Sequence, residues 1–251
     1  MIKQLWIGAT LLVAISSPAA AQPAGLVVSV ASSLHDALAE IAVLYRTSTG
    51  VAVSLNPGGS NTLARQIIDG AKVGLLLSAD DSQMDAVEKA GLVVPGTRTR
   101  LLTNSLAVIV PGGTRKTISF ADLAGPTVQR VAMGEPTSVP AGVYGRKWLE
   151  LEGVWAAVAP KVIPFPTVRA VLAAVEAGRV DAGIVYQTDA IGRPAVLPLL
   201  IPRASALAEL AIVIPAAVIR GPHETEGRRF LAFLQSAPAQ DVFARRGFGR
   251  P

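Results

Sequence analysis

Small or hydroxyl-bearing residues stand directly before four stretches of helical pattern in this chain. The four positions are Ser33, Ser60–Thr62, Ala141–Gly142 and Thr167. The first backbone N–H groups of a helix have no partners inside the helix and carry the positive end of its macrodipole, so a helix start favours an anion. If these starts converge on one cleft, they predict an oxyanion site made of neutral donors, with no Arg or Lys in contact.

The elements that must position these residues begin with an alternation of strand and helix patterns. Short apolar runs predict buried strands, and the residues between them recur at helical spacing until a glycine, such as Gly50 or Gly70, ends the pattern. The predicted strands are residues 26–31, 51–55 and 75–77, and the predicted helices are residues 34–49, 63–69 and 84–90. This order predicts a parallel sheet with helices on both faces.

A second alternation of the same kind follows. Its predicted strands are residues 106–111, 131–133, 161–163, 182–186 and 210–215, and its predicted helices are residues 140–151, 168–176, 226–234 and 240–245. The apolar run at 210–215 mirrors the run at 106–111. Two similar α/β halves, one interrupted by the other, therefore fit better than two consecutive domains.

The composition fits a globular α/β protein and excludes several kinds of site. Of the 251 residues, 51% are hydrophobic, which is enough to bury a sizeable core. The absence of cysteine excludes disulfides, thiolate zinc sites and thiol nucleophiles. The net charge is +5, but the basic residues are scattered singly or in pairs, so no nucleic-acid partner is predicted.

Residues 1–21 have the pattern of a cleaved signal peptide. Lys3 precedes an apolar run at residues 5–15, and small residues ending at Ala21 suit signal peptidase. The run is well short of the roughly 20 residues that a spanning helix needs, and no later run reads as a membrane span. We therefore expect a mature chain that starts at Gln22 and resides in the periplasm, without insertion into the membrane.

Six segments of the chain, in order, resemble the periplasmic molybdate-binding proteins of ABC uptake systems. They are Val30–Leu34, Gly59–Ile67, Leu77–Asp80, Leu102–Leu106, Gly134–Tyr144 and Gly183–Ala190. The likeness extends over nearly the whole chain after the signal segment. It implies a type II periplasmic binding protein, in which two α/β lobes, each a mostly parallel sheet flanked by helices, are joined by two crossing strands.

The resemblance also implies where the lobes divide. The first lobe would hold residues 22–103 and 211–251, and the second would hold residues 104–210. The crossing strands would be the runs around Leu106 and Ile212.

A tetrahedral molybdate or tungstate would sit between the lobes, according to the same resemblance. The matching donors are the hydroxyl and N–H groups of Ser33 and Ser60 on one lobe, and the Ala141 N–H, the Val168 N–H and the Tyr186 hydroxyl on the other. The resemblance implies a monomeric receptor with no catalytic residues and no cofactor. It would close around the oxyanion and deliver it to the membrane permease of an ABC transporter.

A shell made only of donors suits this ligand. Molybdate at neutral pH is a fully ionised dianion with no proton to donate, so a carboxylate in contact would repel it. Hydrogen phosphate would need an acceptor, and none is among the five positions. Sulfate has the same charge and shape, so the sequence leaves a sulfate receptor open as the alternative.

Three positions depart from the family pattern. Residues 71–74 read Ala-Lys-Val-Gly and lack a common acidic residue, Pro57 stands where an aromatic residue is frequent, and His35 replaces a small polar residue or Lys. None of these changes removes a predicted donor, but together they leave room for another oxyanion.

Rival functions receive less support from the residues. A serine hydrolase would need a base, which only His35 or His223 could supply, and no Gly-x-Ser-x-Gly pattern surrounds Ser33 or Ser60. An iron-complex receptor is disfavoured because the chain has three tyrosines in all. A cation site is disfavoured by two distant histidines and no cysteine. A sensory or assembly domain that keeps the fold without transport also remains open.

Overall fold

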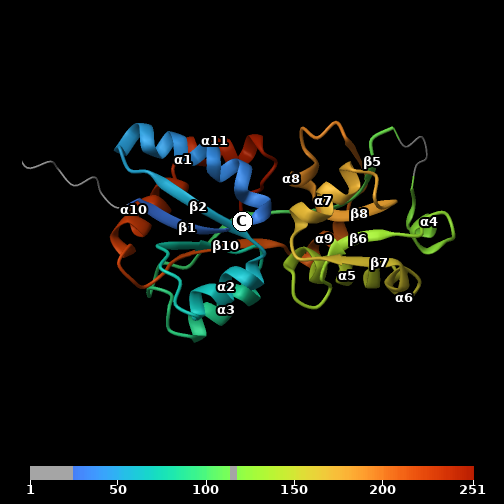
Figure 1. Ribbon diagram of the computed structural model, residues 1–251, viewed down its shortest axis with the longest axis horizontal. Coiled ribbons are helices and arrows are strands. Elements are labelled where there is room, and N and C mark those ends of the chain that lie inside the picture. Colours follow the sequence, from blue (N-terminus) through green and yellow to red (C-terminus); the bar gives the residue numbers. More distant parts are fainter. Residues whose placement is uncertain (1–24, 114–117) are drawn as a thin grey trace, which may run out of the picture.

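A computed structural model describes residues 25–113 and 118–251 of the chain. The predicted signal segment, residues 1–21, lies outside the described residues. The described residues form two lobes, each built on a five-stranded sheet, and Figure 1 shows them side by side.

The sheet of the first lobe combines strands from both ends of the chain. Its order is β2 (Val53–Gly58), β1 (Leu26–Ala31), β3 (Leu75–Leu77), β10 (Val213–Val218) and β4 (Thr99–Thr103). Its helices are η1 (Ser32–Leu34), α1 (His35–Thr49), α2 (Ser60–Ile68), α3 (Asp81–Lys89), α10 (Glu224–Leu234) and α11 (Ala237–Arg245). Strands β1, β2 and β3 are parallel to one another, whereas β10 runs antiparallel to β3 and β4.

The second lobe repeats this plan. The order of its sheet is β7 (Val162–Phe165), β6 (Val131–Gly134), β8 (Ala182–Tyr186), β5 (Leu106–Pro111) and β9 (Val196–Leu200). Its helices are α4 (Phe120–Ala124), α5 (Pro140–Leu151), α6 (Trp155–Val158), η2 (Ala159–Lys161), α7 (Val168–Glu176), α8 (Gln187–Ala190) and α9 (Ala204–Leu210). Strands β6, β7 and β8 are parallel, whereas β5 runs antiparallel to β8 and β9.

The predicted two-lobed α/β fold is confirmed. Each sheet is mixed, because β10 in the first lobe and β5 in the second run antiparallel to both of their neighbours, while the other four strands of each sheet run in one direction. Each of these strands lies directly after a point where the chain passes from one lobe to the other. Strands β5 and β10 therefore enter their sheets from the side of the opposite lobe. They run in the direction opposite to the strands that alternate with helices.

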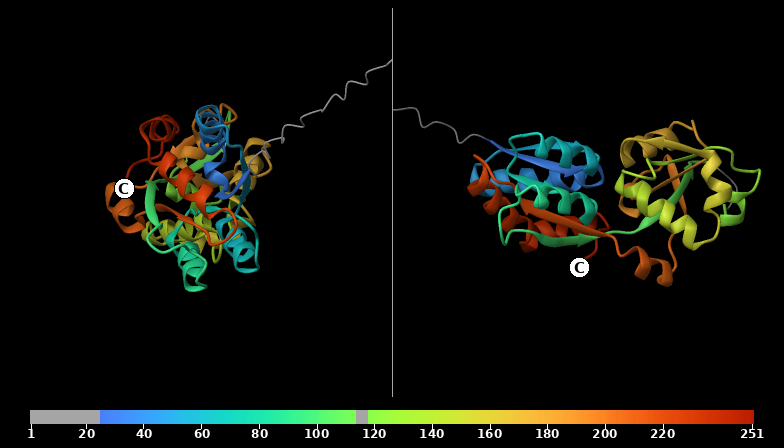
Figure 2. Two further views of the ribbon diagram at one scale, coloured as in Figure 1. Left: turned by 90° about the vertical axis from the view of Figure 1, so that its left-hand side faces the viewer. Right: turned by 90° about the horizontal axis from the view of Figure 1, so that it is seen from below.

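Within the described residues the chain passes between the lobes twice, as Figure 2 shows from below. The first passage lies between β4 and β5 and the second between β9 and β10. The apolar run predicted as a strand at 210–215 begins differently: Leu210 ends helix α9, and the strand covers Val213–Val218. A short apolar run does not by itself distinguish a buried helix end from a strand.

Alternating side chains of the first sheet supply two hydrophobic clusters. Leu75 and Leu77 of β3 belong to the larger cluster with residues of α1, α10 and α11, whereas Leu76 belongs to the smaller cluster with residues of α2 and α3. This period of two is what a strand buried on both faces requires. The helices therefore pack in two layers, one on each face of the sheet. This packing places the starts of η1 and α2 at the carboxyl ends of β1 and β2.

Candidate binding site between the lobes

A small cavity lies where the two lobes face each other. It is bordered by the starts of η1 and α2 in the first lobe, by the starts of α5 and α7 in the second, and by the end of β8. None of the described residues that line it is charged. They are Ala31, Ser32, Ser33, Gly58, Gly59, Ser60, Ala79, Val139, Pro140, Ala141, Thr167, Val168 and Tyr186. The cavity thus brings together all five residues that the sequence predicted as donors.

The two serines of the first lobe present free hydroxyl protons. Ser33 lies in the 3₁₀ turn that leads into α1, and its buried Oγ has no hydrogen-bond partner in the described part of the chain. Ser60 is the first residue of α2, and its Oγ accepts a hydrogen bond of 2.9 Å from the Ala79 N–H. Because this oxygen acts as an acceptor there, the Ser60 proton remains available to a ligand.

Two backbone donors of the second lobe are left free by the way their helices begin. Val139 is the N-cap of α5 and Pro140 occupies the first helical position, so the next residue, Ala141, supplies an N–H without an intrahelical acceptor. Thr167 is the N-cap of α7, and its Oγ1 accepts from the Ala170 N–H at 3.1 Å. That bond leaves the Val168 N–H at the helix start unused.

Tyr186 ends β8 with its hydroxyl group inside the protein. The side chain is buried, and Oη has no hydrogen-bond partner among the described residues. Burial raises the pKa of Tyr186 well above its ordinary value, and the nearby Tyr144, Asp80 and Asp189 raise it further. The phenol therefore keeps its proton at neutral pH and can act only as a donor to an anion.

The arrangement can bind an anion, and no chemistry on it is supported. A buried donor without a partner is costly unless a ligand or water satisfies it, so the unpartnered Ser33 and Tyr186 hydroxyls are the strongest sign of an occupant. Neither His35 nor His223 lines the cavity, so no general base stands beside the serines. Within residues 25–113 and 118–251, no group of three His, Cys, Asp or Glu side chains is placed to hold a metal ion.

The lobes approach each other closely at Gly59. A Cβ atom at this position would lie 2.7 Å from the backbone oxygen of Pro166, which belongs to the other lobe. Hydrogen is therefore the only side chain that fits here with the lobes in this arrangement.

Gly59→Ala is expected to weaken anion binding by about tenfold, because the added methyl group holds the lobes apart. Isothermal titration of the variant measures this loss. Gly25→Ala is the matched control, since this glycine does not line the cavity and its Cβ would meet only Ala52 of the same lobe, 3.3 Å from the backbone oxygen. Equal losses in the two variants would contradict a role for the close approach at Gly59.

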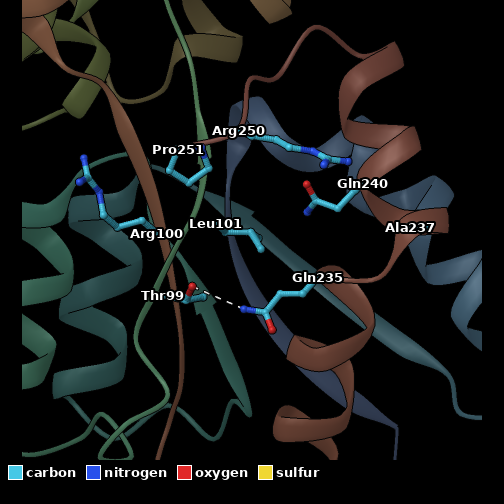
Figure 3. Close-up of a pocket in the computed structure, with 8 residues that line it drawn as sticks. All are labelled: Thr99, Arg100, Leu101, Gln235, Ala237, Gln240, Arg250 and Pro251. Carbon is cyan, nitrogen blue, oxygen red and sulfur yellow. Dashed lines mark hydrogen bonds between the residues drawn. The ribbon is translucent and has the colours of Figure 1, made fainter.

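A larger hollow lies on the first lobe and takes no part in this cavity. Figure 3 shows its lining, which includes Arg100, Gln240 and Arg250. The hydrogen bond drawn there is a long one of 3.5 Å, from Gln235 Nε2 to Thr99 Oγ1. No polar atom of the lining is both buried and unpartnered among the described residues, so nothing marks this hollow as a binding site.

The sequence did not single out the charged groups next to the cavity. Arg169 follows the donor Val168, Asp189 lies three residues after Tyr186, and Asp36 lies three residues after Ser33. The signal that was available for Asp189 is its place at the third position of a helix start, where a carboxylate caps backbone N–H groups. His35 and Pro57, two of the unusual positions, line a neighbouring opening together with Arg169 and not the cavity itself.

Comparisons with known proteins agree with this geometry. Residues 26–249 match the family described as bacterial extracellular solute-binding protein. The chain is 34% identical over 250 residues to the molybdate-binding protein ModA of Escherichia coli, covering 97% of this chain and 96% of that protein. The sulfate-binding protein of Synechococcus elongatus is 31% identical over 128 residues, which are 47% of this chain and 35% of that protein.

Among solved structures, the periplasmic molybdate-binding protein of Azotobacter vinelandii has the same fold. The TM-score is 0.80 at 22% sequence identity, covering 90% of this chain and 99% of that chain. The family is one of solute-binding proteins rather than enzymes. Its match spans both lobes and includes every residue of the cavity. This chain therefore belongs to the bacterial extracellular solute-binding proteins, in the family of the molybdate-binding protein ModA.

Proposed function

We propose that this protein captures molybdate, and also tungstate, in the cavity between its lobes and delivers it to the membrane permease of an ABC transporter. The observation that carries the proposal is the pair of buried, unpartnered hydroxyls, Ser33 Oγ and Tyr186 Oη, in a cavity with no charged lining residue. Near-full-length similarity to ModA of E. coli supports the choice of ligand.

The proposed ligand shell consists of Ser33, Ser60, Ala141, Val168 and Tyr186. All of them offer N–H or O–H donors, and a tetrahedral dianion offers only acceptors. Two helix starts from each lobe add the favourable ends of their dipoles. No metal cation ligand is involved, because molybdenum arrives as an oxyanion.

Closure of the lobes would complete this shell. We propose that the first lobe comprises residues 22–103 and 211–251 and the second residues 104–210, a division that the two sheets support. Each lobe then supplies part of the donor set, so the ligand favours the closed state by contacts that the open state lacks.

The location and partners follow from the same proposal. The chain would work in the periplasm as a monomer after removal of residues 1–21. None of the helices in the described residues combines the length and the apolar character needed to cross a membrane.

Calorimetric titration of the purified protein with molybdate, tungstate, sulfate and phosphate tests the proposal. We expect tight binding of molybdate and tungstate, weaker binding of sulfate and none of phosphate. Because sulfate matches the charge and shape of molybdate and differs in bond length, it is the most demanding comparison. Heat with sulfate but not with molybdate would replace the proposed ligand by the alternative that the partial match to a sulfate-binding protein suggests.

A further inference from the structure

One arginine of the second lobe contacts the first lobe beside the cavity. Arg169 is the second residue of α7, and its Nε donates to the backbone oxygen of Ser32 at 3.2 Å. Its Nη2 donates to Asp36 Oδ2 at 3.0 Å. Ser32 and Asp36 both belong to the first lobe. The side chain of Arg169 is only 23% exposed, so both contacts are partly shielded from water.

The same guanidinium faces a buried carboxylate of its own lobe. Arg169 Nε lies 3.3 Å from Asp189 Oδ1, an ion pair whose geometry does not make a hydrogen bond. The other oxygen, Oδ2, accepts from the backbone N–H of Tyr186 at 3.2 Å. Arg169 therefore connects three donor-bearing segments: the turn that holds Ser33, the helix start at Val168 and the strand end at Tyr186.

Asp36 also binds a second arginine of the opposite lobe. Arg193 Nη2 donates to the same Oδ2 atom at 3.0 Å. Burial opposes ionisation of Asp36, but Arg169, His35 and Arg193 outweigh it and hold its pKa below the ordinary value. Asp36 is therefore a carboxylate at neutral pH that binds two cations of the opposite lobe.

We propose that Arg169 is a positioning residue that latches the lobes together through Ser32 and Asp36 and so slows release of the bound oxyanion. The inference rests on the proposed function, because it gives Arg169 a part in holding that ligand. Arg169 does not line the cavity and so acts through the segments it joins. Contacts that cross the gap stabilise the closed state alone, so their loss shows mainly in the dissociation rate.

Stopped-flow measurement of molybdate release from Asp36→Asn and Arg169→Gln tests the latch. Each variant is expected to release molybdate about tenfold faster than the parent, while the association rate changes less than about threefold. Arg203→Gln is the matched control. It removes the same charge from the second lobe, but its partner Glu152, 3.0 Å away, lies in that lobe too. We expect this control to release molybdate at the parent rate.

Melting temperatures and two further variants separate a latch from a general loss of stability. Asp36→Asn breaks contacts between the lobes but leaves the Arg169–Asp189 pair intact, so it should lower the melting temperature of the ligand-free protein less than Arg169→Gln does. Arg169→Lys keeps the charge but lacks the planar fork that reaches several acceptors, so its release rate should lie between those of the parent and Arg169→Gln. The Asp36→Asn/Arg169→Gln double variant should release molybdate more slowly than the product of the single effects predicts, because both changes break one contact.

The outcomes distinguish this inference from the function on which it rests. A parent protein that binds molybdate, with unchanged release from both single variants, overturns the latch and leaves the proposed function intact. A parent that binds none of the four oxyanions contradicts the proposed function. In that case small-angle scattering of the ligand-free proteins decides the latch: larger radii of gyration in both variants support it, and equal radii overturn it.

Discussion

Val168→Pro is expected to weaken molybdate binding by about 10- to 150-fold, the loss of about 1.5–3 kcal/mol that one hydrogen bond to a charged group contributes. The substitution removes the backbone N–H of this residue, one of the five proposed donors. It should leave the helix in place, because proline is favoured at the first helical position. The preceding Thr167 has φ −146° and ψ 155°, the extended conformation that a following proline requires. Calorimetric titration of the variant measures the loss.

The side chain of Val168 is buried, so its removal must be separated from the loss of the N–H group. Val168→Ala keeps the N–H and shortens the side chain, and we expect its affinity to stay close to that of the parent. If Val168→Ala and Val168→Pro lose the same affinity, the effect comes from packing and the N–H is not a ligand donor. Circular dichroism and the melting temperature establish that both variants are folded.

Much of the proposed donor shell could be predicted because it depends on local rules. Proline at 140, threonine at 167 and serine at 60 are residue types that begin helices, and every helix start leaves N–H groups free whatever the fold around it. The structure places these starts at one cavity, which is the condition under which the helix-start pattern predicts an anion site. Their role as ligands stays a prediction until binding is measured.

The edges of the sheets were harder to predict. Strands β4 (Thr99–Thr103) and β9 (Val196–Leu200) lie at the sheet edges, each beside a strand that has crossed from the other lobe. The sequence of β4 mixes polar and apolar residues, and β9 is a short apolar run interrupted by Pro198; neither has a clear period of two. They become strands because β10 and β5 offer them backbone hydrogen-bond partners. Such pairing depends on contacts with other parts of the fold, which the local sequence does not display.

The ion pairs next to the cavity were missed for a related reason. Asp36 and Arg169 lie far apart in the chain, and each alone looks like a solvated charge on a helix. Only the packing of one lobe against the other brings them to 3.0 Å and shields most of the arginine side chain. An ion pair between two lobes leaves no periodicity or fixed spacing in the sequence by which it could be predicted.

Asp189→Asn is expected to raise the free energy of unfolding at pH 7 by up to about 3 kcal/mol. Burial raises the pKa of Asp189 from 3.8 to about 6, and Arg169 and the Tyr186 N–H only partly offset it. At pH 7 the folded protein must therefore hold a charge that the unfolded chain carries more easily. Asparagine has the same shape and an oxygen for the Tyr186 N–H, but no charge to bury.

The sign of the pH dependence follows from the same shift. Between pH 3.8 and 6 the folded state binds more protons at Asp189 than the unfolded state does, so this group makes the parent more stable as the pH falls. About half of the free energy by which the charged Asp189 destabilises the fold should disappear between pH 7 and pH 5. The difference in free energy of unfolding between the parent and Asp189→Asn, the stability gap, should narrow by that amount. Urea denaturation of both proteins at several pH values measures the gap.

Asp181→Asn supplies a control of opposite sign. Burial opposes ionisation of Asp181, but the backbone N–H groups of Gln129 and Arg130, with the Arg130 side chain, lower its pKa below the ordinary value. Its carboxylate therefore stabilises the fold above the unfolded pKa, and Asp181→Asn should destabilise the protein at pH 7 with no change in the gap down to pH 5. A constant gap between the parent and Asp189→Asn over this range would contradict a raised pKa at Asp189. A narrowing gap would mean that the buried charge of Asp189 lowers the stability of the fold. Residues that serve binding often have such a cost.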